Sequence, residues 1–228
     1  MASLNPSRRR LWAAGPTRLV PPTGRVAGLR PGFHLEPGMR VGLFGGSFNP
    51  AHDGHAHVAE TALRRLDLDR VIWLVSPQNP LKSSRELKPV GRRLADALRE
   101  ARGPSMIVTD VESRLGVRYT IDAVRLLKGR HPGVKFVWVM GSDSLAGFHT
   151  WRGWRRILQE LPVAVIARPG ALLSGRTALA AKRFAHARLP EGAAQRLPDA
   201  APPAWLWLSA PLNQASSTAI RAGLRVDG

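Results

Sequence analysis

Cysteine is absent from this chain of 228 residues. Its absence excludes a disulfide scaffold, a thiolate nucleophile, an iron–sulfur cluster and a cysteine-ligated zinc site. Long apolar runs are absent as well, since the longest are short segments such as Val71–Val75, Phe136–Met140 and Val163–Ala167. A membrane-spanning helix needs roughly 18 or more apolar residues. We therefore expect a soluble, cytoplasmic protein with no membrane partner.

Acidic residues and lysines are scarce, which leaves the chain strongly basic. Sixteen acidic residues stand against 34 basic ones, a formal net charge of +18, and only five of the basic residues are lysines. A nucleic-acid surface would show local basic clusters with interleaved aromatic residues, whereas the arginines here are spread along the whole chain. We interpret the charge as a solvated, arginine-rich surface that also attracts anionic small molecules, and we expect no nucleic-acid partner.

The first 38 residues differ in composition from the rest. They contain six prolines, six arginines and one acidic residue, and they show no helical or alternating apolar period. We predict a basic, Pro- and Gly-rich N-terminal extension over residues 1–38 that is loosely packed. Residues 39–228 are then expected to form one domain, because a 44% content of hydrophobic residues is enough to bury a core at this length.

Short apolar segments alternate with helical patterns from Arg40 onward. Strands are predicted at Val41–Phe44, Val71–Val75, Ser105–Val111, Val134–Met140, Val163–Ala167 and Trp205–Leu208. Helices are predicted around 59–66, at 89–102, Tyr119–Lys128 and Trp151–Leu158, and from Ser216 or Ser217. Strands that are apolar throughout and alternate with helices are typical of a parallel sheet covered on both faces. The pattern predicts a Rossmann-like, doubly wound α/β fold with a mainly parallel sheet, and a ligand beyond the carboxyl ends of the strands.

The loop after the first predicted strand carries the densest group of candidate residues, Gly45-Gly46-Ser47-Phe48-Asn49-Pro50-Ala51-His52-Asp53-Gly54-His55. Adjacent glycines allow a sharp turn and a close approach of the backbone to a phosphate. His52 and His55 are three residues apart at the start of the next helix, so both imidazoles lie on one side of its first turn. Free N–H groups and the helix dipole favour anions there. We predict that both imidazoles donate hydrogen bonds to phosphate oxygens, and that His57, on the other side, is a structural or surface residue.

A second group, Ser216-Ser217-Thr218-Ala219-Ile220-Arg221, follows the last predicted strand. Hydroxyl groups at a helix start ordinarily cap free amides. The same amides and hydroxyls are also able to hold a phosphate chain, and Arg221, four residues after Ser217, adds a forked cationic donor on the same face. Taken alone, this segment leaves a cap and a binding site as open alternatives.

The two groups together resemble the H-x-G-H nucleotidylyltransferase superfamily, and within it the bacterial nicotinate-nucleotide adenylyltransferases. The finer matches are Trp73–Lys82 (WLVSPQNPLK), Arg118–Thr120 (RYT), Met140–Leu145 (MGSDSL), Phe148–Trp151 (FHTW) and Ala167–Gly170 (ARPG). The resemblance runs from about Val41 to Leu224 and leaves the extension unexplained. One departure is the loop near Leu81-Lys82, where many relatives have a histidine and this chain has none.

The resemblance implies adenylyl transfer from ATP to nicotinate mononucleotide, giving nicotinate adenine dinucleotide and pyrophosphate in NAD biosynthesis. A phosphate monoester is already a nucleophile at neutral pH, so alignment and charge stabilisation are expected to do the chemistry without a covalent intermediate. Mg²⁺ is expected to arrive with ATP, held by phosphate oxygens and water rather than by a protein site. The implied catalytic residues are His52, His55 and Arg221. The implied ATP-binding residues are Gly45, Gly46, Ser47, Phe48, Gly141, Asp143, Ser216, Ser217 and Thr218.

The residues implied for nicotinate mononucleotide are Gln78, Lys82, Tyr119, Thr120, Trp151 and Arg168. An aromatic face such as that of Trp151 stacks well on a pyridine ring, and amides at the helix start beside Tyr119 and Thr120 suit a carboxylate. Two alternatives stay open here: Thr120 and Asp143 are equally interpretable as helix caps. Trp73, Trp138 and Trp154 are expected to pack in the core.

Three other functions fit part of the sequence. A sister enzyme such as pantetheine-phosphate adenylyltransferase shares the histidine and serine–threonine motifs, but the S-P-Q-N-P loop and the G-x-D…F-x-x-W segment are not expected there. A preference for nicotinamide mononucleotide, the amidated acceptor, over nicotinate mononucleotide is a nearer alternative, because one contact to the carboxylate or amide group decides it. A non-catalytic RNA-binding protein would show affinity that falls steeply with salt and no pyrophosphate release from ATP. A monomer and a homo-oligomer fit the sequence equally.

Overall fold

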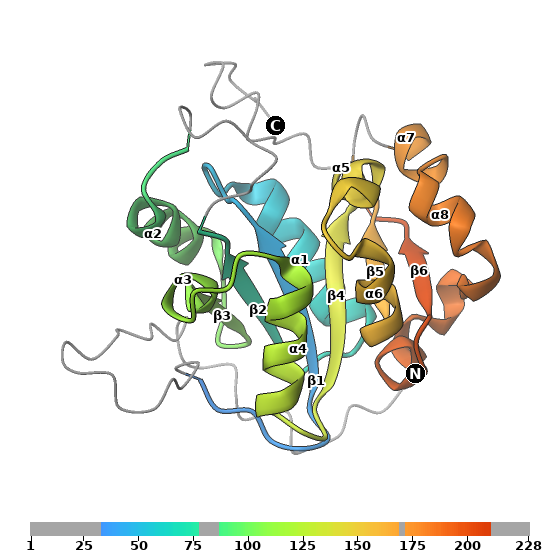
Figure 1. The fold of residues 1–228 in the computed structure, drawn as a ribbon, viewed down its shortest axis with the longest axis horizontal. Helices are drawn as coiled ribbons and strands as arrows, with labels where there is room; N and C mark the ends of the chain where they lie inside the picture. Colours follow the sequence, from blue (N-terminus) through green and yellow to red (C-terminus); the bar gives the residue numbers. More distant parts are fainter. Residues whose placement is uncertain (1–32, 78–86, 169–171, 211–228) are drawn as a thin grey trace.

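The computed structural model describes residues 33–77, 87–168 and 172–210. A six-stranded sheet forms its centre in the order β3-β2-β1-β4-β5-β6, and all neighbouring strands are parallel (Figure 1). The strands are β1 (Arg40–Gly46), β2 (Arg70–Val75), β3 (Met106–Thr109), β4 (Lys135–Gly141), β5 (Val163–Ile166) and β6 (Trp205–Leu208). This arrangement confirms the predicted Rossmann-like α/β fold.

Helices connect the strands and cover both faces of the sheet. The helical segments are α1 (Asp53–Arg65), α2 (Val90–Glu100), α3 (Val111–Arg114), α4 (Thr120–Arg130), α5 (Ser142–Gly147), η3 (Phe148–Thr150), α6 (Trp154–Glu160), α7 (Leu172–Arg176), α8 (Leu179–Arg183), η4 (Ala185–Ala187) and η5 (Glu191–Asp199). Buried side chains of α1, α2 and η5, such as Ala59 and Leu197, form the core on one face. Those of α4, α5, α6 and α8, such as Val124 and Ile157, form the core on the other face. Figure 1 shows α4 and α6 in front of the sheet and α1 behind it.

The strand order places the candidate site. β1 and β4 are neighbours at the centre, and the chain runs from them toward opposite edges of the sheet. In such sheets ligands bind outside the carboxyl ends of the two central strands, where the order reverses. Those ends are Gly46 and Gly141. Across the described ranges, no helix is long and apolar enough to cross a membrane.

Several predicted boundaries were wrong for local reasons. The predicted strand 105–111 ends at Thr109, because the Thr109 hydroxyl accepts a hydrogen bond from the Val111 N–H (3.2 Å) and α3 begins there. The predicted helix 151–158 begins only at Trp154, because Gly153 adopts a left-handed backbone (φ 67°) that separates it from η3. The short helix α5 was not predicted, and it starts directly after β4.

The end of the predicted extension packs against the domain. Leu35 is 4% exposed and belongs to the core, and the ring of Phe33 stacks on that of His131 with centroids 5.7 Å apart. Residues 1–32 lie outside the described part of the chain, so the division at residue 38 stays a prediction.

Candidate active site

Two histidines lie together where β1 leads into α1. His52 is the N-cap of α1 and His55 is in its first turn, and their ring centroids are 3.9 Å apart. His55 also borders the aromatic rings of Phe44, Phe48 and Trp73, with centroids 5.0–6.5 Å away. The structure confirms the predicted placement of both imidazoles on one side of the helix start.

His52 acts as a neutral donor in this arrangement. Its Nδ1 accepts the Gly54 N–H at 3.1 Å, so in the neutral ring the proton is on Nε2. Burial, with the positive charge of Arg168 as a second cause, lowers the pKa of His52 to about 4. The Nε2 atom is buried and has no hydrogen-bond partner among the described residues. A buried N–H that lacks an acceptor is costly unless a ligand supplies one, so His52 can donate to an anion without carrying charge.

The two glycines before the histidines do not form the sharp turn that was predicted for them. They are the last residues of β1, paired with Leu74 and Val75 of β2, and neither has a positive φ. A Cβ on Gly45 would lie 2.5 Å from the Trp138 indole, and one on Gly46 would lie 3.1 Å from the Phe48 ring. The predicted sharp turn at the glycines was therefore wrong, because both positions make room for aromatic packing.

The chain turns instead at Phe48, which has a left-handed backbone (φ 46°) and is 1% exposed. A bulky residue in this region costs roughly 1–3 kcal/mol unless packing holds it. The Phe48 ring is held by Phe44 and Trp73, at centroid distances of 5.4 and 5.1 Å. Ser47 and Phe48 thus form a rigid loop between β1 and the histidine pair.

An ion pair bridges the carboxyl ends of β4 and β5. The Arg168 Nη1 donates to the Asp143 Oδ2 at 2.9 Å, and the Arg168 N–H donates to the buried Ser142 hydroxyl at 2.9 Å. The Arg168 side chain is 12% exposed and that of Asp143 is 49% exposed. Both charges act on the pKa of His52, so residues predicted for different substrates lie in one electrostatic environment.

Gly141 leaves the space that this ion pair occupies. A Cβ there would lie 2.4 Å from the Asp143 carboxylate and 2.7 Å from the Arg168 side chain. Asp143 does not cap α5, whose N-cap is Gly141 and has no side-chain hydrogen bond. The structure thus contradicts the cap interpretation of Asp143.

Three of the residues predicted for the acceptor, Tyr119, Thr120 and Trp151, lie on the face of the sheet that α4 and α6 cover. Tyr119 is the N-cap of α4 without a side-chain cap, and Thr120 is its first residue, so Thr120 is not the cap. Trp151 is half-buried and packs edge-to-face on Phe148 and Trp138, with centroids 5.3 and 6.2 Å apart. Trp138 also lies against Gly45, so one indole connects the two predicted substrate regions. Trp73 and Trp138 are fully buried, as predicted.

A buried arginine that the sequence analysis did not single out holds the loops of the site. Arg93 on α2 is 0% exposed. Its guanidinium donates to the carbonyl oxygens of Lys88 (2.9 Å), Ser47 (2.7 Å), Ser76 (2.7 Å) and Pro77 (2.8 Å). These carbonyls belong to the loops after β1 and β2 and to the segment before α2. One side chain therefore fixes three segments to one another.

A buried carboxyl group lies beside the same loops. Glu112 on α3 is 6% exposed, and burial raises its pKa to about 7, although a hydrogen bond to Ser76 acts in the opposite direction. No pattern in the sequence marked it. One feature of the sequence could have indicated that Arg93 is buried: it lies four residues before Ala97, and so on the same, buried face of α2.

Several predicted residues fall outside the described residues. They are Gln78, Lys82, Ser216, Ser217, Thr218 and Arg221. In the described part of the chain, no group of three or more His, Asp or Glu side chains is arranged to hold a metal ion. The donors that the described site offers are imidazole and guanidinium groups, which suit an anion, and Asp143 adds one carboxylate to them.

Known proteins are similar to this chain over most of its length. A family model described as cytidylyltransferase-like matches residues 43–223. A protein of Caulobacter sp. named "Probable nicotinate-nucleotide adenylyltransferase" is 67% identical over 183 residues, which are 80% of this chain and 97% of that protein. A protein of Mesorhizobium japonicum with the same name is 53% identical over 188 residues, 82% of this chain and 96% of that protein.

Solved structures share the fold at low sequence identity. The nicotinic acid mononucleotide adenylyltransferase of Plasmodium falciparum complexed with NaAD matches with a TM-score of 0.59 and 17% identity, over 81% of this chain and 83% of that chain. The same enzyme complexed with APC matches with a TM-score of 0.58 and 16% identity over the same shares.

Proposed function

This chain belongs to the nicotinate-nucleotide adenylyltransferase family, and from that membership we propose the reaction and the roles of its residues. The enzyme transfers AMP from ATP to nicotinate mononucleotide, giving nicotinate adenine dinucleotide and pyrophosphate. A phosphate oxygen of the mononucleotide attacks the α-phosphorus of ATP. The bond between the α-phosphorus and the bridging oxygen breaks, and pyrophosphate leaves.

The observation that carries the proposal is the donor on His52. Its Nε2–H is buried, has no acceptor among the described residues, and lies beside His55 at the start of α1. A neutral donor needs no counter-ion before substrate binds, and its hydrogen bond strengthens as charge accumulates on the departing pyrophosphate. His52 and His55 therefore hold the triphosphate and stabilise the leaving group. Arg221, outside the described residues, is assigned the same task from the sequence.

The remaining candidate residues divide between the two substrates. Asp143, with Gly141, contacts the nucleoside of ATP, and its ion pair with Arg168 at 2.9 Å keeps the carboxylate in place. The guanidinium of Arg168 is a forked cationic donor of the kind that binds phosphate, and we assign it to the mononucleotide phosphate. Trp151 stacks on the pyridine ring, and the amides at the start of α4 bind its carboxylate.

The assignments from the sequence complete the two sets. On the ATP side they are Gly45, Gly46, Ser47, Phe48, Ser216, Ser217 and Thr218. On the acceptor side they are Gln78, Lys82, Tyr119 and Thr120. Mg²⁺ enters as the counter-ion of ATP, held by phosphate oxygens and water, because the described donors of this site bind anions rather than cations.

Pyrophosphate release from ATP tests the proposal. The full-length enzyme is incubated with ATP, Mg²⁺ and one acceptor at a time: nicotinate mononucleotide, nicotinamide mononucleotide or pantetheine phosphate. We expect the highest kcat/KM with nicotinate mononucleotide. Release with pantetheine phosphate alone would assign the chain to a sister activity. No release with any acceptor, together with salt-sensitive binding of RNA, would refute the enzymatic assignment.

A further inference from the structure

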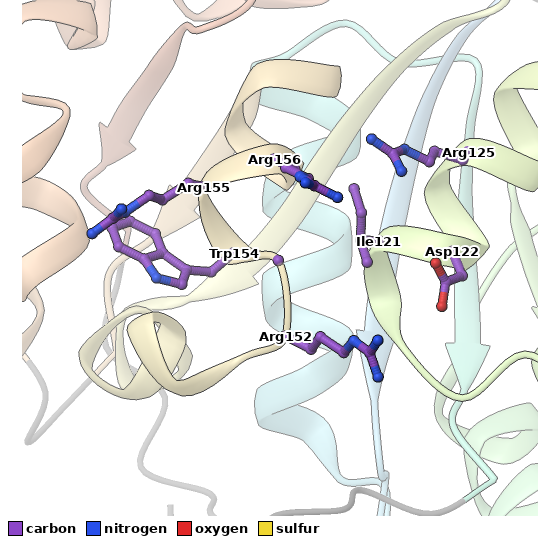
Figure 2. Close-up of a pocket in the computed structure, with 8 residues that line it drawn as sticks. Ile121, Asp122, Arg125, Arg152, Trp154, Arg155 and Arg156 are labelled. Carbon is purple, nitrogen blue, oxygen red and sulfur yellow. The ribbon is translucent and has the colours of Figure 1, made fainter.

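A second cleft lies between α4 and the beginning of α6, on the outer side of the helical layer (Figure 2). Its volume is about 470 Å³, within the range of small-molecule sites. It is lined by Ile121, Asp122, Arg125, Arg152, Gly153, Trp154, Arg155 and Arg156. None of these residues is assigned to ATP or to the mononucleotide above.

The described residues do not balance the positive charge of this cleft. Four of the eight lining residues are arginines and one is an aspartate. Arg125 is paired through its Nε with Glu160 at 2.9 Å, and Lys128 pairs with the same carboxylate. No carboxylate of the described residues lies within ion-pair distance of Arg152, Arg155 or Arg156. Some arginines elsewhere, such as Arg40, Arg65 and Arg114, have such partners, and others, such as Arg64 and Arg130, have none among the described residues; the cleft differs in that several unpaired arginines line one hollow.

Three of the arginines surround an apolar side chain, Ile121. Figure 2 shows the side-chain ends of Arg125 and Arg156 on one side of Ile121 and that of Arg152 on the other. Like charges gathered in this way repel one another unless an anion lies between them. Arg155 instead stacks on the Trp154 ring at 5.3 Å.

The base of the cleft depends on a glycine. Gly153 has a left-handed φ of 67°, and a Cβ there would lie 3.2 Å from the Ile121 side chain. The glycine thus lets the segment before α6 pass close to α4 while the flanking arginines point outward. The backbone conformation at Gly153 therefore helps to form the cleft, together with the side chains around it.

We propose that this cleft binds a small anion with two or more phosphate groups, such as pyrophosphate or the polyphosphate of a nucleotide. Three guanidinium groups around one hollow match the several oxyanions of such a molecule, and forked guanidinium donors bind phosphates in pairs of hydrogen bonds. An extended nucleic-acid strand suits the surface less well, because the carboxylates of Asp122 and Glu160 flank the cleft and would repel its backbone.

An anion bound in the cleft would affect the residues assigned to nicotinate mononucleotide. This inference rests on the proposed function. The Arg152 guanidinium lies over the Tyr119 ring at 4.5 Å, and Arg152 directly follows Trp151. A phosphate that draws Arg152 into the cleft would weaken this stacking. Occupancy is therefore expected to change the KM for the mononucleotide more than kcat.

Isothermal titration with pyrophosphate, without Mg²⁺, tests the binding site. The wild-type enzyme is expected to bind two equivalents, one at the catalytic site and one in the cleft. The R152A/R156A variant should lose the second equivalent, or bind it more than tenfold more weakly. The matched control is R64A/R130A, which removes the same charge from two exposed arginines outside the cleft and should keep both equivalents.

Other outcomes separate the alternatives. One equivalent in the wild type that R152A/R156A does not weaken would overturn the cleft proposal and leave the catalytic proposal standing. One equivalent that R152A/R156A abolishes would support the cleft and count against the catalytic site. Titration with orthophosphate, AMP and ATP then identifies the source of the phosphates, with orthophosphate expected to bind weakest. If R152A/R156A weakens only the binding of a single-stranded RNA, the cleft is a nucleic-acid surface and the proposal is wrong.

Discussion

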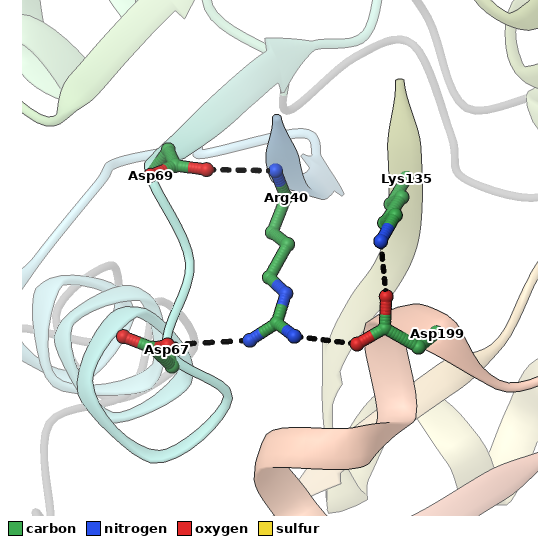
Figure 3. A network of polar contacts seen from close by, with 5 residues as sticks. All are labelled: Arg40, Asp67, Asp69, Lys135 and Asp199. Atoms are coloured by element: carbon green, nitrogen blue, oxygen red, sulfur yellow. Dashed lines mark hydrogen bonds and ion pairs between the residues drawn. The ribbon is translucent and has the colours of Figure 1, made fainter. Parts of the chain in front are cut away.

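Charged side chains have different partners at the two ends of the central sheet. At the amino-terminal end, Arg40 donates to Asp67 at 3.2 Å and to Asp199, which also accepts from Lys135 (Figure 3). These side chains are 23–44% exposed. At the carboxyl end, Arg93 is fully buried and donates only to backbone carbonyls.

The difference shows what each end is able to do. Charges that pair with one another beside water contribute little energy each, about 0–1 kcal/mol. Their contacts join the starts of β1 and β4 to the end of η5. At the other end the cationic side chain organises backbone loops, and the buried His52 N–H keeps a donor without a protein acceptor among the described residues. The charged groups at the amino-terminal end thus join elements of the fold, whereas those at the carboxyl end shape the loops and the substrate site.

The largest expected effect comes from Arg93. Arg93→Met leaves four carbonyls without their donor, and breaking a buried charged network costs about 3–5 kcal/mol. We expect the urea unfolding midpoint to fall and kcat to fall with it, while Arg93→Lys recovers part of both. The control is R92M, an exposed neighbour on α2. If R93M unfolds like R92M, the buried arginine does not hold the loops.

His55 is expected to affect turnover rather than folding. Removing one donor from a site that stabilises developing charge costs roughly 10²–10³-fold in rate. We therefore expect H55A to lower kcat by this factor, with an unchanged circular dichroism spectrum and unfolding midpoint. H57A, two residues further along α1, is the matched control. If the kcat of H55A lies within a few-fold of that of H57A, the imidazole of His55 does not take part in catalysis.

Glu112 makes the carboxyl end sensitive to pH. Its pKa of about 7 in the folded state lies above the ordinary value of 4.5, so the folded state binds the proton more tightly than the unfolded state does. The resulting stabilisation is complete below pH 4.5 and is lost as the pH rises through 7. Glu112→Gln, which stays neutral, should match the wild type at pH 4 and exceed its unfolding free energy by roughly 3 kcal/mol at pH 8.

The measurement for Glu112 is chemical denaturation from pH 4 to pH 8. The exposed Glu36→Gln variant serves as the reference for the loss of one carboxylate. A difference between E112Q and wild type that does not grow with pH would show that the carboxyl group is ionised without penalty in the folded protein.

The smallest effect is expected at the amino-terminal end. Asp199→Asn removes the charge shared by Arg40 and Lys135, and exposed pairs of this kind contribute about 1 kcal/mol or less. The loss should shrink further in 1 M NaCl, and kcat/KM should stay at the wild-type value. A loss of activity in D199N would show that the charges at the amino-terminal end of the sheet also affect the active site.

Much of this molecule was predictable because the responsible patterns are local. The strands are apolar on both faces, which predicted a covered parallel sheet, and the spacing of three between His52 and His55 predicted that their rings would lie on one side of the helix start. The conformation of Gly45 and Gly46 was not predictable, because the ring that fills the space above Gly45 belongs to Trp138, far along the chain. Arg93 was missed for the same reason, since three segments supply its acceptors.

The position of the Trp138 indole has a consequence for redesign. The ring occupies the volume that any side chain at position 45 would need, and its edge meets Trp151. A larger residue at position 45 is therefore compatible with the sheet only if position 138 becomes smaller in the same step. Such a paired exchange would also remove the support beneath Trp151, so reshaping the loop that precedes the histidines inevitably alters the opposite face of the sheet.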